Sequence, residues 1–271
     1  RLPFEDKIYT TDDDSTESFI SFFSFTQDQE IKFLGNIKEI SKDEVQNINF
    51  QLPIAPITLL NESHEQYINK IENTIDLIKK NELKKLVIKR KKISEYQSFN
   101  LSETFFNLTK TYPSAFVYAF EKEGVAWIGA FSELLGKYNL TTSSFETMSL
   151  AGTLPIEEEW SEKEIKEQKP VTEYILNILS QYSTQVEISD TYDHPSGNIK
   201  HLRTDFKTKI KVEQVESIIK DLHPTPAVCG IPKNFCKTAI AEIEKFDREL
   251  YAGYSRIELN DSVYYFVNLR C

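Results

Sequence analysis

The sequence predicts an α+β fold, built as one domain over residues 1–271. Strand-like runs are mixed with amphipathic helices, and they lack the strict alternation that a parallel βαβ protein requires. Apolar residues make up 40% of the chain, and 18 Phe and 13 Tyr supply enough aromatic surface for a sizeable core. No internal repeat or low-complexity linker divides the sequence, so a single domain is expected.

Composition argues against several classes of partner. The net charge of −10 argues against a nucleic-acid groove. The sequence has no apolar run long enough for a membrane span. It begins with neither an apolar leader nor an initiator Met, so the chain looks trimmed there. Three cysteines without metal-type spacing favour a reduced, cytoplasmic compartment. The oligomeric state stays open, with a monomer favoured.

The first third of the chain predicts a strand followed by helices. Residues 17–25 are rich in Phe, Ile and Ser, which favours a strand. Ser63 and Gln66 match a capping box, and isoleucines then recur at helical spacing, so residues 64–81 predict an amphipathic helix. Ser102 is expected to cap a second, shorter helix.

The middle of the chain predicts mainly strands. The run KKLVIKRKKIS at 84–94 favours a strand, and residues 115–121 and 125–130 favour a hairpin. The segment 131–140 leads into another strand.

A long helix with an internal proline comes next. The helix is predicted over 161–182, and Pro170 means that it either starts close to the proline or is kinked there. Residues 186–190 and 199–210 predict strands on either side of a loop at 194–197.

The last third predicts two helices and a hairpin. Residues 212–222 favour a helix, and the three prolines and one glycine of 223–232 exclude regular structure. The next helix, 232–246, opens on a proline in the first turn, where proline is tolerated. Residues 251–259 and 262–270 favour a closing hairpin.

The stretch 147–167 is a candidate binding element. Gly152 lets the backbone approach a ligand, and exposed N–H groups at such a break can hold a carboxylate. Glu164 and Glu167 follow at i, i+3 on one helix face, which suggests an anionic substrate held through Mg²⁺. The alternative is a glycine turn before an ordinary acidic helix start, and this stretch alone favours that alternative.

Two further residues could perform acid–base chemistry. Lys85 would point inward if its strand were central, and burial would lower its pKa towards that of a general base. An exposed edge strand is the alternative, and composition alone favours it. Glu133 follows the apolar run WIGAFSELL, where a carboxyl group has its pKa raised and can act as an acid. A solvated turn residue is its commoner alternative.

Other candidates keep two interpretations open. His201 lies in a strand, where a lone histidine is more often a structural donor than a catalyst. Arg270 ends an apolar strand and needs an anion, either a protein carboxylate or a substrate one. The irregular stretch 223–232 either lines a ligand site or is a rigid connector.

The order of these motifs is more specific than any one of them, and it resembles the chorismate-utilising enzymes. That group includes isochorismate synthase, salicylate synthase, anthranilate synthase component I and aminodeoxychorismate synthase. The resemblance implies the fold of anthranilate synthase component I, antiparallel β-sheets packed in a sandwich with helices on the outside. The motifs are KKLVIKR at 84–90, WIGAFSELL at 127–135, LAGT at 150–153, SEKEIKE at 161–167, HLRT at 201–204, LHPTPAVCGIP at 222–232, FDRELYAG at 246–253 and FVNLRC at 266–271.

Two positions suggest which branch of the family the chain resembles. Water-adding members have a lysine where Lys85 stands, whereas amine-adding members have glutamine. Ala151 occupies the position at which aminodeoxychorismate synthases carry a nucleophilic lysine. The resemblance is therefore greatest to isochorismate synthase, which converts chorismate to isochorismate for menaquinone or siderophore synthesis. Salicylate synthase and a non-catalytic chorismate-binding module are the alternatives.

The resemblance also implies roles for individual residues. Lys85 would activate water to attack C2 of the ring, and Glu133 would protonate the departing C4 hydroxyl beside His201. The metal role falls on Glu167, with Glu164 as its water-mediated partner. The implied substrate contacts are Ala151, Gly152 and Thr153 at the ring carboxylate, Tyr251 and Arg270 at the enolpyruvyl carboxylate, and Ala227 at the reacting water.

The chain departs from the family at its end. The family continues beyond this point into a final helix that carries another Mg²⁺-binding glutamate, but this sequence stops at Cys271. We therefore expect a domain truncated at its C-terminus, with weak Mg²⁺ binding and low activity.

Overall fold

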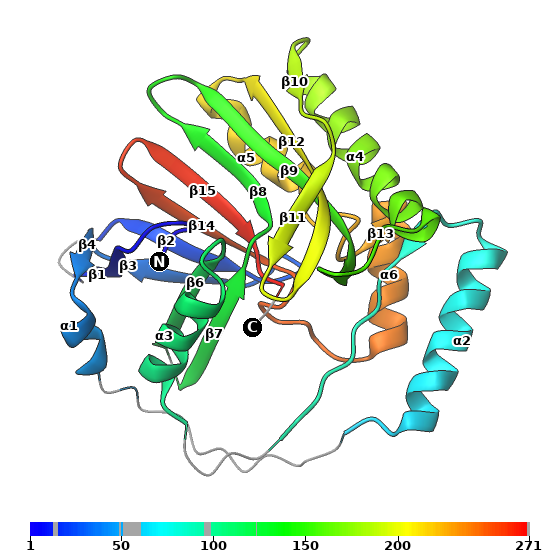
Figure 1. Ribbon diagram of the computed structural model, residues 1–271, viewed down its shortest axis with the longest axis horizontal. Helices are drawn as coiled ribbons and strands as arrows, with labels where there is room; N and C mark the ends of the chain where they lie inside the picture. The colour runs from blue at the N-terminus through cyan, green and yellow to red at the C-terminus, as the bar shows by residue number, and fades with distance from the viewer. Residues whose placement is uncertain (13–15, 49, 51–60, 95–98, 123, 270–271) are drawn as a thin grey trace.

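The computed structural model describes residues 1–12, 16–48, 50, 61–94, 99–122 and 124–269 (Figure 1). Its main element is a nine-stranded antiparallel sheet in the order β10-β12-β9-β8-β15-β14-β2-β3, with β11 also paired to β12. The strands are β2 (Ser18–Phe23), β3 (Glu30–Leu34), β8 (Leu134–Asn139), β9 (Ser144–Pro155), β10 (Val186–Ile188), β11 (Tyr192–Ser196), β12 (Ile199–Lys209), β14 (Tyr254–Leu259) and β15 (Ser262–Val267).

Three two-stranded antiparallel sheets complete the β structure of the described residues. Two of them pair β1 with β4 and β6 with β7, and the third pairs β5 with β13. Their bounds are β1 (Ile8–Thr11), β4 (Ile37–Ile40), β5 (Lys85–Leu86), β6 (Phe116–Lys122), β7 (Val125–Phe131) and β13 (Gly230–Ile231).

The helices lie outside these sheets (Figure 1). They are α1 (Lys42–Gln46), α2 (His64–Lys80), α3 (Leu101–Thr111), α4 (Glu162–Tyr182), a 3₁₀ turn η1 (Val212–Gln214), α5 (Val215–Leu222) and α6 (Lys233–Glu244). Buried side chains of α4 and α5, such as Leu179 and Ile218, share one core cluster with Phe145 and Phe206 of the large sheet. Helices α4 and α5 therefore cover one face of that sheet.

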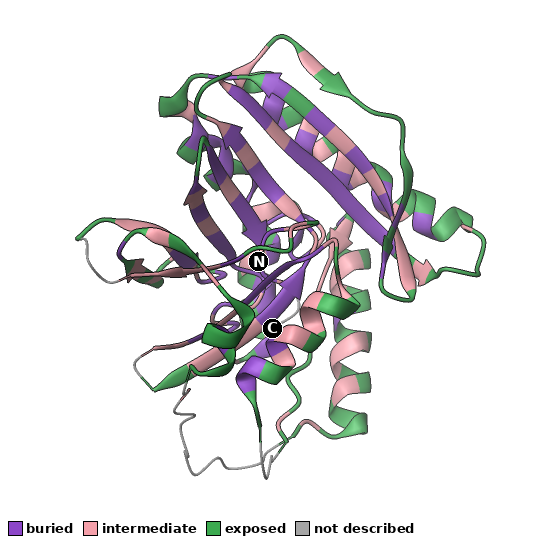
Figure 2. Ribbon diagram, turned by 60° about the vertical axis from the view of Figure 1, so that its left-hand side comes forward, coloured by how far each residue is buried: buried purple, intermediate pink, exposed green. Residues whose placement is uncertain are grey.

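The opposite face packs against the β6–β7 hairpin. Phe116 on β6 stacks on Phe266 of β15 with ring centroids 4.8 Å apart, and Tyr118 lies 4.7 Å from Phe22 of β2. The interior between these layers is buried (Figure 2). Beyond the hairpin, Phe105 of α3 packs on Val117. The predicted α+β fold of antiparallel sheets in a sandwich, with helices outside, is confirmed.

Several predicted elements are confirmed, and one open alternative is resolved. The capping box at Ser63 starts α2, since its hydroxyl accepts from the N–H of Gln66 and the Gln66 side chain accepts in return. The closing hairpin turns at Asn260, which has φ 55°. Helix α4 runs continuously from Glu162 to Tyr182 with Pro170 inside it.

The predicted strand at 84–94 is mostly wrong, since only Lys85 and Leu86 pair with another strand. After Leu86, the backbone N–H groups of Val87 and Lys89 donate to acceptors outside any strand. Val87 donates its N–H to Cys229 O (2.8 Å), and Lys89 donates to the Glu244 carboxylate (2.6 Å). The segment is extended because a loop and a side chain accept its hydrogen bonds.

Three local predictions also need correction. Asn100, not Ser102, caps α3, because the hydroxyl of Ser102 is buried and donates to Val45 O (3.0 Å). The predicted loop at 194–197 is largely strand β11, in which Pro195 is tolerated because β11 pairs on one side only. Pro232 is the N-cap of α6 and does not lie in its first turn.

Candidate active site

Eight of the predicted site residues line one cavity of about 150 Å³. The cavity lies where β9 and β12 meet the β7–β8 connection, β5 and the first turns of α4. Its lining residues are Lys85, Phe131, Ser132, Glu133, Leu150, Ala151, Gly152, Thr153, Glu167, Ser196, His201, Ala227 and Leu269. The sequence therefore identified much of the lining, although those residues are far apart along the chain.

Strand β9 has a bulge at this cavity, where a break had been predicted. The pairing of β9 with β12 shifts register between Ala151 opposite Leu202 and Leu154 opposite Lys200. Two residues of β9, Gly152 and Thr153, thus face the single residue His201, and Gly152 has φ +71°. A glycine at this φ is the usual first residue of such a bulge. The strand continues to Pro155, and the bulge turns its backbone towards the cavity.

The bulge also fixes the imidazole of His201. Nδ1 lies 2.9 Å from Gly152 O and 3.1 Å from the hydroxyl of Thr153. A carbonyl oxygen can only accept, so Nδ1 carries the hydrogen and donates it to Gly152. Nε2 is then the basic nitrogen of the ring.

Glu133 is buried, with 2% of its surface exposed. Burial raises the pKa of its carboxyl group to about 7, while the hydrogen bond from Thr225 and the charge of Lys85 act in the opposite direction. Thr225 donates its hydroxyl to Oε1 at 3.0 Å, and Oε2 is buried with no hydrogen-bond partner among the described residues. The predicted rise in the pKa of Glu133 is confirmed, and its cause is desolvation.

Lys85 enters the cavity from β5. Its Nζ forms an ion pair with Glu167 Oε1 at 3.0 Å, and 14% of the lysine side chain is exposed. Its backbone pairs with Ile231 of β13, and the neighbouring Gly230, opposite Leu86, has φ +144°. A Cβ on Gly230 would lie 2.3 Å from Lys85 O and 2.7 Å from Cys236 Sγ, so only glycine fits there. Lys85 and Glu133 line the same cavity, as the sequence predicted.

Glu164 does not line the cavity. Its Oε2 accepts from the Ser161 hydroxyl at 2.5 Å and from the Ser161 N–H at 3.2 Å, which makes it the last residue of a capping box. The Ser161 hydroxyl lowers the pKa of this carboxyl group. The prediction of a second carboxylate beside Glu167 overlooked this signature, although the same one at Ser63 had been recognised.

Two predicted substrate contacts are not among the described lining residues. Tyr251 lies outside the lining, with the ammonium of Lys89 4.3 Å from its ring centroid. Arg270 lies outside the described residues. Sequence reasoning also missed Thr225, although it belongs to the 223–232 segment that had been considered as a ligand-site loop.

The donor set fits only a weakly held divalent cation. The described residues contain no cluster of three or more His, Cys, Asp or Glu side chains placed to bind a metal. Two of the described lining residues carry carboxyl groups, and a pKa of about 7 leaves Glu133 about half protonated at neutral pH. Glu167 is therefore the better candidate for a hard ligand among the described residues. Mg²⁺ accepts one or two carboxylates when substrate oxygens and waters supply the remaining ligands.

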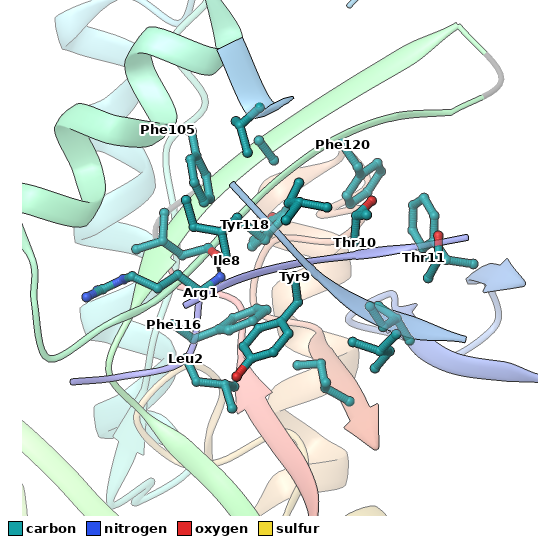
Figure 3. Close-up of a pocket in the computed structure, with 18 of the residues that line it drawn as sticks. Arg1, Leu2, Ile8, Tyr9, Thr10, Thr11, Phe105, Phe116, Tyr118 and Phe120 are labelled. Carbon is teal, nitrogen blue, oxygen red and sulfur yellow. Dashed lines mark hydrogen bonds between the residues drawn. The ribbon is translucent and has the colours of Figure 1, made fainter. Parts of the chain in front are cut away.

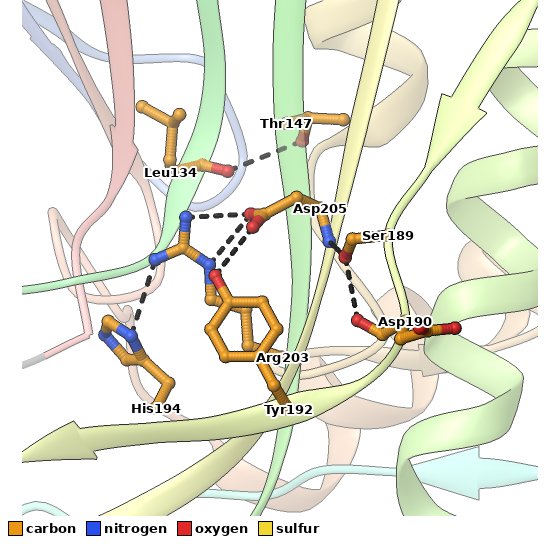
Figure 4. Close-up of polar contacts among 8 residues, drawn as sticks. All are labelled: Leu134, Thr147, Ser189, Asp190, Tyr192, His194, Arg203 and Asp205. Carbon is orange, nitrogen blue, oxygen red and sulfur yellow. Dashed lines mark hydrogen bonds and ion pairs between the residues drawn. The ribbon is translucent and has the colours of Figure 1, made fainter.

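A polar cluster stiffens the strands behind His201 (Figure 4). Arg203 pairs with Asp205 at 2.7 Å, and Tyr192 donates its hydroxyl to the same carboxylate at 2.6 Å. Arg203 also contacts His194, which lies opposite His201 on β11. Burial lowers the pKa of His194 to about 4, so its imidazole is neutral at pH 7. The cluster holds β11 and β12 in register beside the cavity.

A second cavity of about 180 Å³ lies between β1, β2, β6 and α3 (Figure 3). Its lining is mainly aliphatic and aromatic, including Ile8, Phe105, Phe116 and Phe120. Of the described residues that line it, Arg1 alone is charged. Its described lining therefore offers no pair of acidic and basic side chains, in contrast to the cavity that contains Lys85 and Glu133.

The fold and the composition of the cavity define a class. The chain belongs to the chorismate binding enzyme family, whose model matches residues 10–270. Among curated proteins it is similar to isochorismate synthase MenF of Haemophilus influenzae, with 25% identity over 258 residues. That match covers 89% of this chain and 59% of the relative, so the chain spans about three fifths of the relative's length.

Solved structures show the same fold. DhbC of Bacillus anthracis matches with a TM-score of 0.71 and 25% identity, covering 93% of this chain and 72% of that one. The menaquinone-specific isochorismate synthase MenF of Escherichia coli has a TM-score of 0.70 at 19% identity, and the match covers 93% of this chain and 69% of that one.

None of the described helices of the present chain has the length and apolar content that crossing a bilayer requires.

Proposed function

We propose that this chain provides the catalytic machinery of an isochorismate synthase, acting on chorismate in the cytoplasm. The observation that carries the proposal is that Lys85 and Glu133 line one cavity in a chain of the chorismate-binding family. A basic and an acidic group beside one ring suit the addition of water at C2 coupled to loss of the hydroxyl at C4. The product would serve menaquinone or siderophore synthesis.

In this mechanism Lys85 removes a proton from water as the water oxygen bonds to C2 of the ring. The ring double bonds shift, the C4–O bond breaks, and Glu133 gives its proton to the departing hydroxyl, which leaves as water. Each of these proton transfers contributes roughly 10²–10⁴-fold to the rate. The pKa of Glu133, about 7, keeps a large fraction of it protonated at neutral pH.

Lys85 must release its ion pair with Glu167 before it can act as a base, because a protonated ammonium has no free electron pair. The carboxylate of Glu167 would then hold Mg²⁺ together with the ring carboxylate of chorismate. The metal would neutralise that carboxylate in the bound substrate. Gly152 and Thr153 lie on the bulge that would face the same group.

The test is a product assay on the full-length protein, with chorismate and Mg²⁺ followed by chromatography. We expect isochorismate from the unmodified protein and a loss of about 10²–10⁴-fold in turnover for Lys85→Ala. Lys84→Ala is the matched control, because Lys84 is exposed and does not line the cavity. Near-normal turnover by Lys85→Ala would contradict the assignment of Lys85. Salicylate as the product would instead identify a salicylate synthase.

A further inference from the structure

The two oxygens of Glu133 have different surroundings. Oε1 accepts the hydroxyl hydrogen of Thr225 at 3.0 Å, whereas Oε2 is buried and has no partner in the part of the chain that the structure describes. A neutral carboxyl group has one carbonyl oxygen, which accepts, and one hydroxyl oxygen, which donates. A donor at Oε1 makes Oε1 the carbonyl oxygen and leaves the acidic hydrogen on Oε2.

Thr225 is held rigidly enough to impose this choice. The residue is 2% exposed, and its own carbonyl accepts from the N–H groups of Val228 (3.1 Å) and Cys229 (3.0 Å). His223, two residues before Thr225, donates from Nε2 to Ala252 O at 2.9 Å and accepts at Nδ1 from the side-chain amide of Gln27 at 2.9 Å. The loop that carries the threonine hydroxyl is therefore fixed on both sides.

We propose that Thr225 is a positioning residue, which fixes the rotamer of Glu133 and directs its acidic Oε2 hydrogen towards the substrate in the cavity. The inference deepens the proposed function and rests on it. Thr225 does not line the cavity itself, so it acts through Glu133. A group fixed in the productive orientation before the reaction avoids the cost of ordering it during the reaction.

The titratable groups around Glu133 must stay unchanged in the test. Lys85, Glu167 and His201 line the same cavity, and Lys85 lowers the pKa of Glu133. Thr225 also lowers that pKa, because its hydroxyl stabilises the carboxylate. Replacing Thr225 by valine removes the hydroxyl, keeps the shape of the side chain, and changes none of these three titratable neighbours.

The experiment compares the full-length protein with Thr225→Val and Thr225→Ser. Glutamate labelled with ¹³C at the carboxyl carbon reports ionisation by NMR without substrate, and Glu133→Gln identifies the resonance. In Thr225→Val we expect the Glu133 midpoint to rise by about one pH unit. We expect kcat for isochorismate formation to fall about 10-fold with KM within about two-fold, since only orientation in the transition state is lost. Thr225→Ser should restore both values.

An unchanged Glu133 midpoint in Thr225→Val would overturn the proposal, and so would a shifted midpoint with unchanged kcat. If the valine variant does not fold, Thr225→Ala makes the same comparison. The NMR titration needs no chorismate, so it separates the two hypotheses. Failure of the unmodified protein to form isochorismate would refute the proposed function, while the midpoints would still decide whether Thr225 controls Glu133.

Discussion

At the scale of single residues, the defining feature is a carboxyl group kept away from water. Glu133 lies at the end of a run of buried side chains, and desolvation moves its pKa from 4.5 to about 7. A sequence can indicate this effect because it depends on apolar neighbours in the same segment. It cannot identify the partner, since Thr225 is 92 residues away.

The burial of Glu133 has a measurable cost in stability. Its pKa is higher in the folded state than in the unfolded state, so the folded protein binds more protons between pH 4.5 and about 7. Unfolding free energy should therefore fall as pH rises through this window, by about 3 kcal/mol. Glu133→Gln should not show this fall. Denaturant unfolding of both proteins at pH 5 and pH 8 measures the difference, and parallel pH profiles would exclude it.

Glu167 can be tested against a neighbour on the same helix. Glu167→Gln removes the carboxylate that we propose to hold Mg²⁺, so we expect Mg²⁺-dependent chorismate binding to weaken at least about 10-fold. Glu162→Gln is the control, because Glu162 is exposed and pairs with Lys166. Isothermal titration calorimetry with and without Mg²⁺ measures the effect. Equal weakening by both substitutions would remove Glu167 from the metal site.

At the scale of elements, the bulge in β9 joins a backbone distortion to the geometry of the cavity. A Cβ on Gly152 would lie 3.3 Å from Glu164 Cβ and 3.4 Å from Glu164 O, at a φ that disfavours side chains. Gly152→Ala should lower unfolding free energy by about 1–3 kcal/mol and disturb the contact of His201 with Gly152 O.

Gly124→Ala is the matched control for this prediction. Gly124 also has a positive φ, +77°, but a Cβ there would meet no atom within 4 Å. The Gly124→Ala variant should lose stability through backbone strain alone and should keep normal turnover. Thermal unfolding and the product assay on both variants separate strain from the effect on the cavity. Normal activity in Gly152→Ala would show that the bulge is not needed.

The capping boxes at Ser161 and Ser63 allow a similar comparison. Ser161→Ala and Ser63→Ala should each cost about 1 kcal/mol of unfolding free energy, because each removes a hydroxyl that caps a helix. Ser161→Ala should also weaken chorismate binding, since Glu164 packs against Gly152 of the bulge. Ser63→Ala should leave binding unchanged. Denaturant unfolding and calorimetry measure the two effects, and equal affinities would refute a role for the cap in the site.

Elements with local signals could be predicted from the sequence, and elements that depend on distant partners could not. The start of α2 and the closing hairpin follow from residues within a few positions of each other. The segment after Leu86 had the composition of a strand, but Cys229 and Glu244 accept its hydrogen bonds. Serine is a residue type that often caps helices, but tertiary packing buries Ser102 against Val45.

At the scale of the whole molecule, the aromatic layer between the large sheet and the β6–β7 hairpin holds the sandwich together. Phe116 is 6% exposed and contacts rings from both layers. Phe116→Ala should lower unfolding free energy by about 3–5 kcal/mol. Phe4→Ala, at a side chain that is 77% exposed, should change it by less than about 0.5 kcal/mol. Denaturant unfolding of both variants measures these changes. Similar losses of unfolding free energy in the two variants would mean that the aromatic layer contributes little to stability.

The candidate site was predicted in part because the family motifs include its lining residues, yet the sequence alone could not assemble them. Lys85, Glu133 and His201 come from separate elements, and only the long-range pairing of β9 with β12 and of β5 with β13 brings them together. Tyr251 matched a motif as well as His201 did, but the fold turns it towards Lys89.

The two-residue ladder between β5 and β13 shows how the activity proposed for this chain could be switched off. Lys85 pairs with Ile231 in that ladder, and a Cβ on the neighbouring Gly230 would lie 2.3 Å from Lys85 O. A methyl group added at residue 230 would push the two strands apart and withdraw the Lys85 amine, without changing the identity of any residue that lines the cavity. The outcome would be a folded protein whose proposed proton acceptor is displaced from the cavity.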